Sequence, residues 1–201
     1  MILLVALVVS LLVALVRGGK LLNLANISLR LGWLALLAFA AQALVIYAPL
    51  PRGQGLLAPR SLFLLTSYGV LIVVILANRR LPGMCLIGLG LLLNLTVMVA
   101  NGGFMPVAPE ALAKAGLSGL ALGQEAGARL RATKDILLPR EMTRLWPLSD
   151  VFAIPPPLGS VFSLGDLVLA IGLFVLLQRV MVQSSSKEEM TSKDGGAATI
   201  R

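Results

Sequence analysis

The chain has 201 residues, of which 58% are hydrophobic and 13% are charged, and its formal net charge at pH 7 is +8. Its mean hydropathy of +0.93 lies far outside the range of a soluble domain, so the composition predicts an integral membrane protein. With no histidine and a single cysteine, Cys85, the sequence excludes Ser/His/Asp and Cys/His nucleophilic systems, histidine-ligated haem, Cys/His zinc sites and intramolecular disulfides.

Five apolar runs are predicted to cross the membrane as helices, since about 20 apolar residues span the hydrocarbon core. The runs are Ile2–Val16, Leu31–Leu50, Ser61–Ala77, Pro82–Ala100 and Leu164–Val182. The first run is short, and it would cross only with flanking residues through Leu22 or with local thinning of the bilayer. It lacks a basic region before it and a cleavage site after it, so it is interpreted as an uncleaved anchor and not a signal peptide.

The charged residues are distributed unevenly along the chain. All nine acidic residues lie at or beyond Glu110, which excludes a proton relay or cation site of Asp or Glu inside the first four runs. The basic residues lie in loops and in the tail, and they form no stripe with aromatic residues between them. This distribution indicates membrane topology and not nucleic-acid binding.

Lysine and arginine in the short loops predict the orientation. Three basic residues separate the first and second runs, two separate the third and fourth, and four lie in the last turn of the fifth run or after it, whereas the opposite short loop has only Arg52 and Arg60. We therefore place the amino terminus outside and the carboxyl terminus in the cytoplasm.

The sequence thus predicts an all-α, polytopic helix bundle of about five spans in a bacterial cytoplasmic membrane. Its parts are a four-span bundle over 1–100, an extracytoplasmic segment with short surface helices over 101–163, a fifth span over 164–183 and a disordered cytoplasmic tail over 184–201.

Small and amide-bearing residues share one face of the fourth run. Gly90, Asn94, Val97 and Asn101 follow one another at spacings of four, three and four, which places them on one side of a helix. Asn94 falls well inside the hydrocarbon zone, where an unsatisfied amide is costly, so it should face another helix or a polar cavity. Gln42 in the second run is a candidate partner, and packing between helices is the favoured role of both amides.

Two aspartates stand near the end of the outer segment. Ser163 and Asp166 match a capping box, in which the serine accepts a hydrogen bond from a helix-start amide and the carboxylate accepts one from the serine amide. Asp150 follows Ser149 before a proline run, where a turn is its ordinary role. Together with Asn101 the two aspartates are expected to form an outer polar cluster.

The rest of the outer segment is basic. A short helix is expected from Pro109, and a solvated surface helix is expected over Gly123–Trp146. The basic residues of the second stretch either face water, which is favoured, or contact anionic lipid headgroups. They are Arg129, Arg131, Lys134, Arg140 and Arg144.

Three segments, "LLNLTVMVANGGFMPV", "LWPLSDVF" and "FSLGDLVLAIGLFVLL", occur in this order. The chain resembles in them an uncharacterised family of bacterial integral membrane proteins, domain of unknown function 5317, and the resemblance implies topology but no activity. The stretch "FSLGDLVLAIG" is also similar to the last span of lipoprotein signal peptidase, an intramembrane aspartyl enzyme, which would place Asp166 at a catalytic position. The fourth run ends in "ANGGF" and lacks the other aspartate of that family, so Asp150 would have to serve instead.

Three functions follow as hypotheses. The first is a structural or binding role, in which the outer polar cluster holds the outer segment against the bundle. The second is a membrane-interface hydrolase or peptidase for a lipid-linked or membrane-peptide substrate, with Asp150 and Asp166 as acid and base and Asn101 positioning the substrate. The third is a small transporter or small-molecule binder with Asn94 and Gln42 around a cavity. None of the three implies a metal or an organic cofactor, and the expected partner is the lipid bilayer.

Overall fold

The structure is a computed structural model that describes residues 2–47, 55–130 and 133–197, with side chains as far as Val182. The helices are α1 (Ile2–Val16), α2 (Leu22–Ala25), α3 (Gly32–Tyr47), α4 (Pro59–Ala77), α5 (Met84–Ala100), α6 (Pro109–Lys114) and α7 (Leu164–Ala197). The strands are β1 (Met105–Val107), β2 (Asp135–Leu137), β3 (Phe152–Ile154) and β4 (Ser160–Phe162). Three short 3-10 turns are η1 (Ser118–Leu120), η2 (Arg140–Met142) and η3 (Trp146–Leu148).

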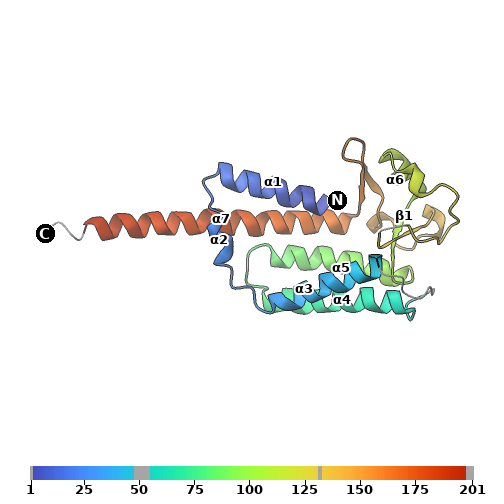
Figure 1. Ribbon diagram of the computed structural model, residues 1–201, viewed down its shortest axis with the longest axis horizontal. Helices are drawn as coiled ribbons and strands as arrows, with labels where there is room; N and C mark the ends of the chain where they lie inside the picture. The colour runs from blue at the N-terminus through green and yellow to red at the C-terminus, as the bar shows by residue number, and fades with distance from the viewer. Residues whose placement is uncertain (1, 48–54, 131–132, 198–201) are drawn as a thin grey trace.

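The long helices form a bundle in which α7 packs between α1 and α5, and α4 packs between α5 and α3. Figure 1 shows these helices side by side, with the elements of residues 101–163 gathered at one end of the bundle. The last long helix of the chain therefore lies next to the first. We call residues 101–163 the cap.

By length and composition, two of the described helical stretches could cross a membrane, namely α4 and Leu164–Val182 of α7, with mean hydropathies of 2.0 and 1.9. The apolar helices α1, α3 and α5 are shorter, at 15, 16 and 17 residues. The second predicted run extends to Leu50, but residues 48–50 lie outside the described part of the chain.

Bundle and cap share one hydrophobic core. Leu64 of α4 and Val97 and Met98 of α5 are buried in the same cluster as Met105 of β1 and Ile136 of β2. The two short strands directly after α5 and before η2 thus continue the core of the helices beyond their ends. This packing fixes the cap on the bundle, since moving it would expose apolar surface.

The cap contains strands, which corrects the all-α prediction. Strand β1 pairs in parallel with β2, and β3 pairs antiparallel with β4. The predicted surface helix over Gly123–Trp146 is wrong, because β2 and η2 occupy that stretch. Ile136 and Leu137 are buried against β1, and Pro139 cannot continue a helix. The predicted short helix from Pro109 is confirmed as α6.

At the carboxyl end the structure differs from the predicted disordered tail. Helix α7 runs on to Ala197, and in Figure 1 it extends beyond all the other helices. No proline interrupts this stretch, and several of its residues, including Gln183 and Met190, favour the helix intrinsically.

Candidate functional site

The buried amide of Asn94 in α5 is satisfied by the start of α7. Its Nδ2 donates to Oδ1 of Asp166 at 2.7 Å, and its Oδ1 accepts from Oγ of Ser163 at 2.8 Å. The sequence analysis named Gln42 as a candidate partner, but both of these bonds run to α7, whereas Gln42 lies on α3. The reason is the packing order, in which α7 covers the face of α5 that carries Asn94.

The predicted capping box is confirmed. The amide of Asp166 donates to Oγ of Ser163 at 3.0 Å, and the amide of Ser163 donates to Oδ2 of Asp166 at 3.3 Å. Because Ser163 and Asp166 also bond to Asn94, the helix cap and the helix contact form one closed polar network. Each carboxylate oxygen of Asp166 accepts a hydrogen bond within it.

Glycines allow this network to form. A Cβ on Gly90 would come within 2.5 Å of the carbonyl oxygen of Gly165, and a Cβ on Gly172 would come within 2.7 Å of the amide of Ile87. Helices α5 and α7 can approach this closely only where side chains are absent. The short side chain of Asn94 can then reach across to Asp166.

A lysine of the cap enters the same region. Nζ of Lys134 donates to the hydroxyl of Tyr68 in α4 at 3.1 Å. Burial alone would lower the pKa of Lys134, but Tyr68 and the carboxylates of Asp166, Asp150 and Asp135 outweigh burial and raise this pKa above its usual value. The lysine therefore keeps its charge although its side chain is half-buried.

Asp150 is the most enclosed carboxyl group of this region. It is 4% exposed, and its Oδ1 has no hydrogen-bond partner in the described part of the chain. Burial raises the pKa of Asp150 well above its usual value; Asp135 and Asp166 add to this effect and Lys134 opposes it. Asp150 is held in place by its backbone amide, which donates to the carbonyl of Pro106 in β1 at 3.0 Å.

Asp135 resembles Asp150 in its surroundings. Its Oδ1 is also buried without a hydrogen-bond partner among the described residues. Burial raises the pKa of Asp135, and Asp166 raises it further, whereas Lys134 lowers it. Lys134 thus interacts electrostatically with three carboxyl groups. Because burial raises the pKa of Asp135 and Asp150, these two retain protons at a pH where an exposed aspartate has lost its proton. We call Tyr68, Lys134, Asp135, Asp150 and Asp166 the charged cluster.

A family model for a family of unknown function (DUF5317) matches residues 26–178. The chain belongs to this family. No curated protein and no solved structure matches the chain. The matched region of this DUF5317 chain contains every residue of the charged cluster, whereas α1 lies before it.

Asn101 of the DUF5317 chain makes its hydrogen bonds to backbone groups. At the end of α5, Nδ2 of Asn101 donates to the carbonyl of Arg144 at 2.9 Å, and its Oδ1 accepts from the amide of Arg144 at 2.9 Å. Gly102 and Gly103 follow with φ of +84° and +99°, so the predicted termination of the helix at Asn-Gly-Gly is confirmed. Asn101 therefore fixes the backbone of the cap.

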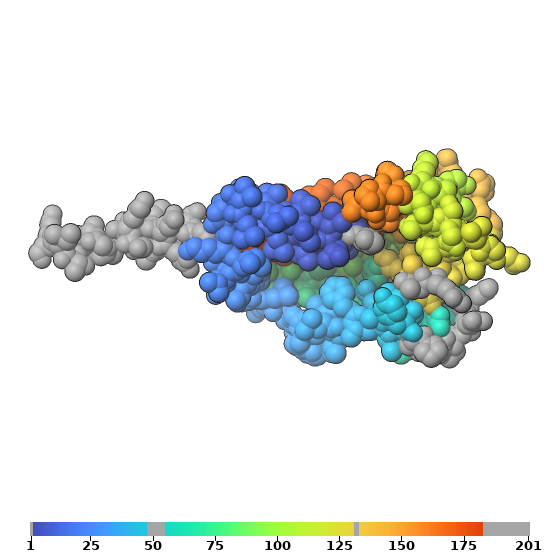
Figure 2. Space-filling view, turned by 45° about the horizontal axis from the view of Figure 1, so that its top comes forward, coloured from blue at the N-terminus to red at the C-terminus, as the bar shows by residue number. Residues whose placement is uncertain are grey.

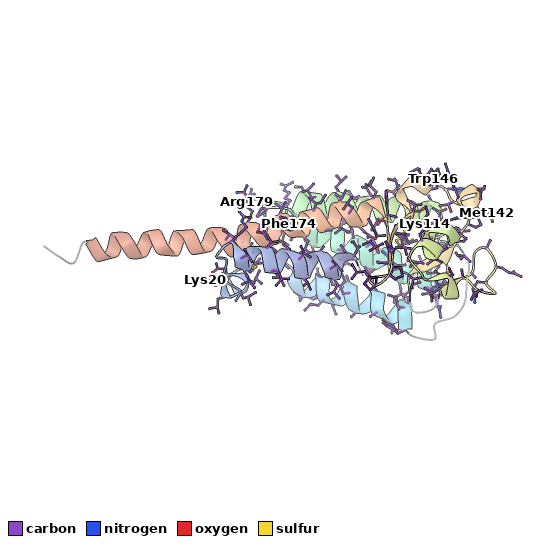
Figure 3. The ribbon with its side chains drawn as sticks, turned by 90° about the horizontal axis from the view of Figure 1, so that it is seen from above. Lys20, Lys114, Met142, Trp146, Phe174 and Arg179 are labelled. Carbon is purple, nitrogen blue, oxygen red and sulfur yellow. The ribbon has the colours of Figure 1, made fainter. Side chains whose placement is uncertain are left out.

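The basic residues of the cap divide into inner and outer ones. Lys134 belongs to the charged cluster, and Arg129 donates to the carbonyl of Val45 in α3 at 3.2 Å. Arg140 lies on the ring of Trp146, 3.7 Å from its centroid, and Arg144 is exposed. Arg131 lies outside the described residues. Contact with lipid headgroups stays a prediction. Arg140 and Arg144 are exposed, and Figure 3 shows Trp146 at this end of the molecule.

Sequence reasoning missed Tyr68 and Asp135 as site residues and took Lys134 for a surface cation. The available signal was the pair Lys134–Asp135 directly before the apolar residues Ile136 and Leu137. A charged pair that leads into a buried strand is placed near the core by the strand itself.

Proposed function

We propose that the chain is a multi-pass protein of a bacterial cytoplasmic membrane, with α1, α3, α4, α5 and the first part of α7 as spans. The exposed apolar surface supports this proposal, since Leu22 and Leu36 are 79% and 72% exposed. Only 33% of the apolar window of α4 and 44% of that of α7 is buried inside the protein. A soluble protein rarely leaves so much contiguous apolar surface in water, whereas lipid covers it at no cost.

The orientation follows from the cations and the cap. Lys20 and Arg179 lie at the end opposite the cap, as Figure 3 shows, and Lys and Arg are retained on the cytoplasmic side. The cap is then extracytoplasmic and the amino terminus is outside.

Cys85, the single cysteine, gives a direct test of this topology because it is exposed near the cytoplasmic start of α5. A membrane-impermeant maleimide should label Cys85 only after intact cells are permeabilised. The matched variant Cys85→Ala with Gln124→Cys carries its thiol on the exposed part of the cap and should be labelled in intact cells. Labelling of Cys85 from outside would contradict the orientation.

We propose a structural or binding role for the protein, in which the bundle holds the cap in one fixed position. The observation that carries it is that two amides fix the cap at α5: Asn94 of α5 bonds to Ser163, and Asn101, the residue that ends α5, bonds to the backbone of Arg144. Protease added outside intact cells should cut the cap of Asn101→Ala faster than that of the wild type. The control Thr96→Ala removes an exposed hydroxyl that bonds to its own helix, and its cap should be cut at the wild-type rate. A wild-type rate for Asn101→Ala as well would contradict the proposal.

An aspartyl hydrolase or peptidase is the second candidate, and the environment of Asp150 favours it. Asp150 has a raised pKa and a buried oxygen without a partner, and the charge of Asp166 acts on it. A carboxyl group that keeps its proton where an exposed aspartate has lost it can serve as the acid of an acid–base pair, and Asp166 is the proposed second member of that pair. The substrate would be a membrane peptide or a lipid-linked molecule.

Substitution separates the two candidates. In cells lacking the wild-type gene, Asp150→Asn and Asp166→Asn would be compared for protein level and for rescue of the deletion phenotype, with Glu110→Gln on exposed α6 as control. Normal protein levels with loss of rescue support the hydrolase. Normal levels with full rescue contradict it and leave the structural role. Asn94, which the transporter hypothesis placed in a cavity, bonds to α7, and we do not carry that hypothesis forward.

A further inference from the structure

A cavity of about 410 Å³ lies at the end of the bundle opposite the cap. It is lined by Arg17, just after α1, and by Gln178, Arg179 and Val182 of α7. Figure 3 shows Arg179 and Lys20 at this end, and Figure 2 shows α1, in blue, covering part of α7. This cavity is separate from the charged cluster, since α7 runs from Asp166 to Arg179 between them over about 20 Å at 1.5 Å per residue.

A buried amide orients one of the two arginines. Gln178 is 6% exposed, and its Nε2 donates to the carbonyl of Ser10 at 2.8 Å. Its Oε1 is thereby turned to accept from Nη1 of Arg17 at 2.9 Å. Since a guanidinium carries five N–H donors, Arg17 keeps donors for a further acceptor after this bond is made. The position of its charge at the mouth of the cavity is set before any ligand arrives.

The chemistry of the cavity selects an anion. Arg17 and Arg179 line it, and the backbone amide of Lys20 donates to the carbonyl of Met181 at 3.3 Å, which brings a third basic residue to the same end. The sequence contains no carboxylate before Glu110 and none between Asp166 and Glu188. The segments that line the cavity, at Arg17 and over residues 178–182, therefore contain basic residues and no acidic residue. Two guanidinium groups match the oxygen atoms of a phosphate.

The surroundings of the cavity select a lipid over free phosphate. Val16, directly before Arg17, is 89% exposed, and Leu12 of α1 and Phe174 of α7 are also exposed. Figure 3 shows Phe174 near Arg179. Apolar side chains beside a phosphate site give acyl chains a surface to lie on, which inorganic phosphate cannot use.

We propose that this cavity binds the phosphate of an anionic phospholipid of the cytoplasmic leaflet, with Arg17 and Arg179 as its ligands and Gln178 as the residue that positions Arg17. The proposal rests on the membrane embedding proposed above. It assigns a lipid site to α1 and to the end of α7, outside the machinery of the charged cluster.

The test uses the full chain purified in a mild detergent. Phosphatidylglycerol, phosphatidylcholine and inorganic phosphate are each titrated, and bound lipid is counted by native mass spectrometry while thermal unfolding is followed in parallel. The cavity variant is Arg17→Gln with Arg179→Gln. The control is Arg79→Gln with Arg80→Gln, which removes the same charge from exposed positions between α4 and α5.

We expect phosphatidylglycerol to bind the wild type and the control alike, and to bind the cavity variant at least tenfold more weakly. Equal loss in the control, or equal binding of phosphatidylcholine, would show only a general surface attraction and would overturn the site. Competition by inorganic phosphate at the concentration of the lipid would overturn the lipid as the source of the phosphate. Arg179→Glu keeps the bond between Arg17 and Gln178 and inverts one charge, so it repeats the test if the double variant unfolds.

The result of the lipid-binding experiment does not depend on the result of the Cys85 labelling experiment. Labelling of Cys85 in cells reports which side of the membrane α5 begins on, whereas lipid counting on the purified chain reports binding at Arg17 and Arg179. Correct labelling with no preference for the anionic lipid would refute the lipid site alone.

Discussion

The apolar part of α7 carries polar side chains at both of its ends, and these side chains are covered at one end and open at the other. At the start, Asp166 is covered by the cap and bonded to Asn94 and Ser163, in a region where both signs of charge occur. At the other end, Arg179 lines an open cavity. A region with both signs of charge can be closed, because its charges compensate one another, whereas a region of one sign stays open to water or to a counter-charge.

The largest expected effect is at the closed end, from Lys134→Met. Lys134 is the cation on which the carboxyl groups of Asp135, Asp150 and Asp166 all act. Removing one partner from a buried charge group costs about 3–5 kcal/mol of unfolding free energy, which would be measured by thermal or denaturant unfolding in detergent. Lys114→Met on the exposed face of α6 should change it by less than about 0.5 kcal/mol. Equal effects of the two variants would show that the cluster is not closed.

The two ends can be compared through their buried amides. Asn94→Ala leaves Oδ1 of Asp166 without a donor and the hydroxyl hydrogen of Ser163 without an acceptor, so we expect a loss of about 3 kcal/mol. Gln178→Ala frees a carbonyl and the exposed Arg17, and a loss of about 1 kcal/mol is expected. Chemical unfolding of both variants under the same conditions measures which of the two loses more stability. A greater loss for Gln178→Ala would reverse the comparison of the two ends.

Between the two ends of the bundle, α5 and α7 pack closely at their glycines. Gly90→Ala would place its Cβ against the backbone of Gly165 and should destabilise the protein by about 1–3 kcal/mol. Gly69→Ala in α4 meets nothing within 4 Å, and it should stabilise the protein by about 0.5–1 kcal/mol through helix propensity. Opposite signs in thermal unfolding are expected, and a neutral Gly90→Ala would mean that the helices are not in close contact.

The smallest effect is a dependence of stability on pH. Asp150 and Asp135 bind protons more tightly in the folded chain than at their usual pKa near 3.8. Their contribution to stability is therefore full below that pH and is lost as pH rises through the raised pKa of the folded state. Unfolding temperatures measured across a pH series should fall less steeply with rising pH for Asp150→Asn than for the wild type. Glu110→Gln should keep the wild-type slope, and an unchanged slope in Asp150→Asn would contradict the proton-binding role.

The sequence predicted the helices better than the contacts between them. Uninterrupted apolar runs and local signals such as the capping box at Ser163 and the Asn-Gly-Gly stop after Ala100 depend on neighbouring residues, so the end of α5 and the start of α7 could be predicted directly. The partner of Asn94 could not, because it depends on which helix packs on which. A single sequence shows which residues share one face of a helix, but it does not show which other helix packs against that face.

The cap was predicted least well for a related reason. Strand β1 pairs with β2 from Met105↔Asp135 to Val107↔Leu137, and three-residue strands are too short to show an alternating pattern. The burial of Lys134 follows from this pairing. Its charge alone indicates a surface residue, and only the register of the two strands turns it toward Tyr68.

The place of α7 between α1 and α5 has a consequence for synthesis of the protein. In the proposed membrane topology, Asn94 is inserted before Ser163 and Asp166 have been translated, and Ser10 is inserted long before Gln178. Until α7 has been synthesised, the amide of Asn94 lacks the partners that it has in the folded structure. The helix that supplies partners to both α1 and α5 is thus made last, and a chain that stops before residue 163 would keep the amide of Asn94 without these partners.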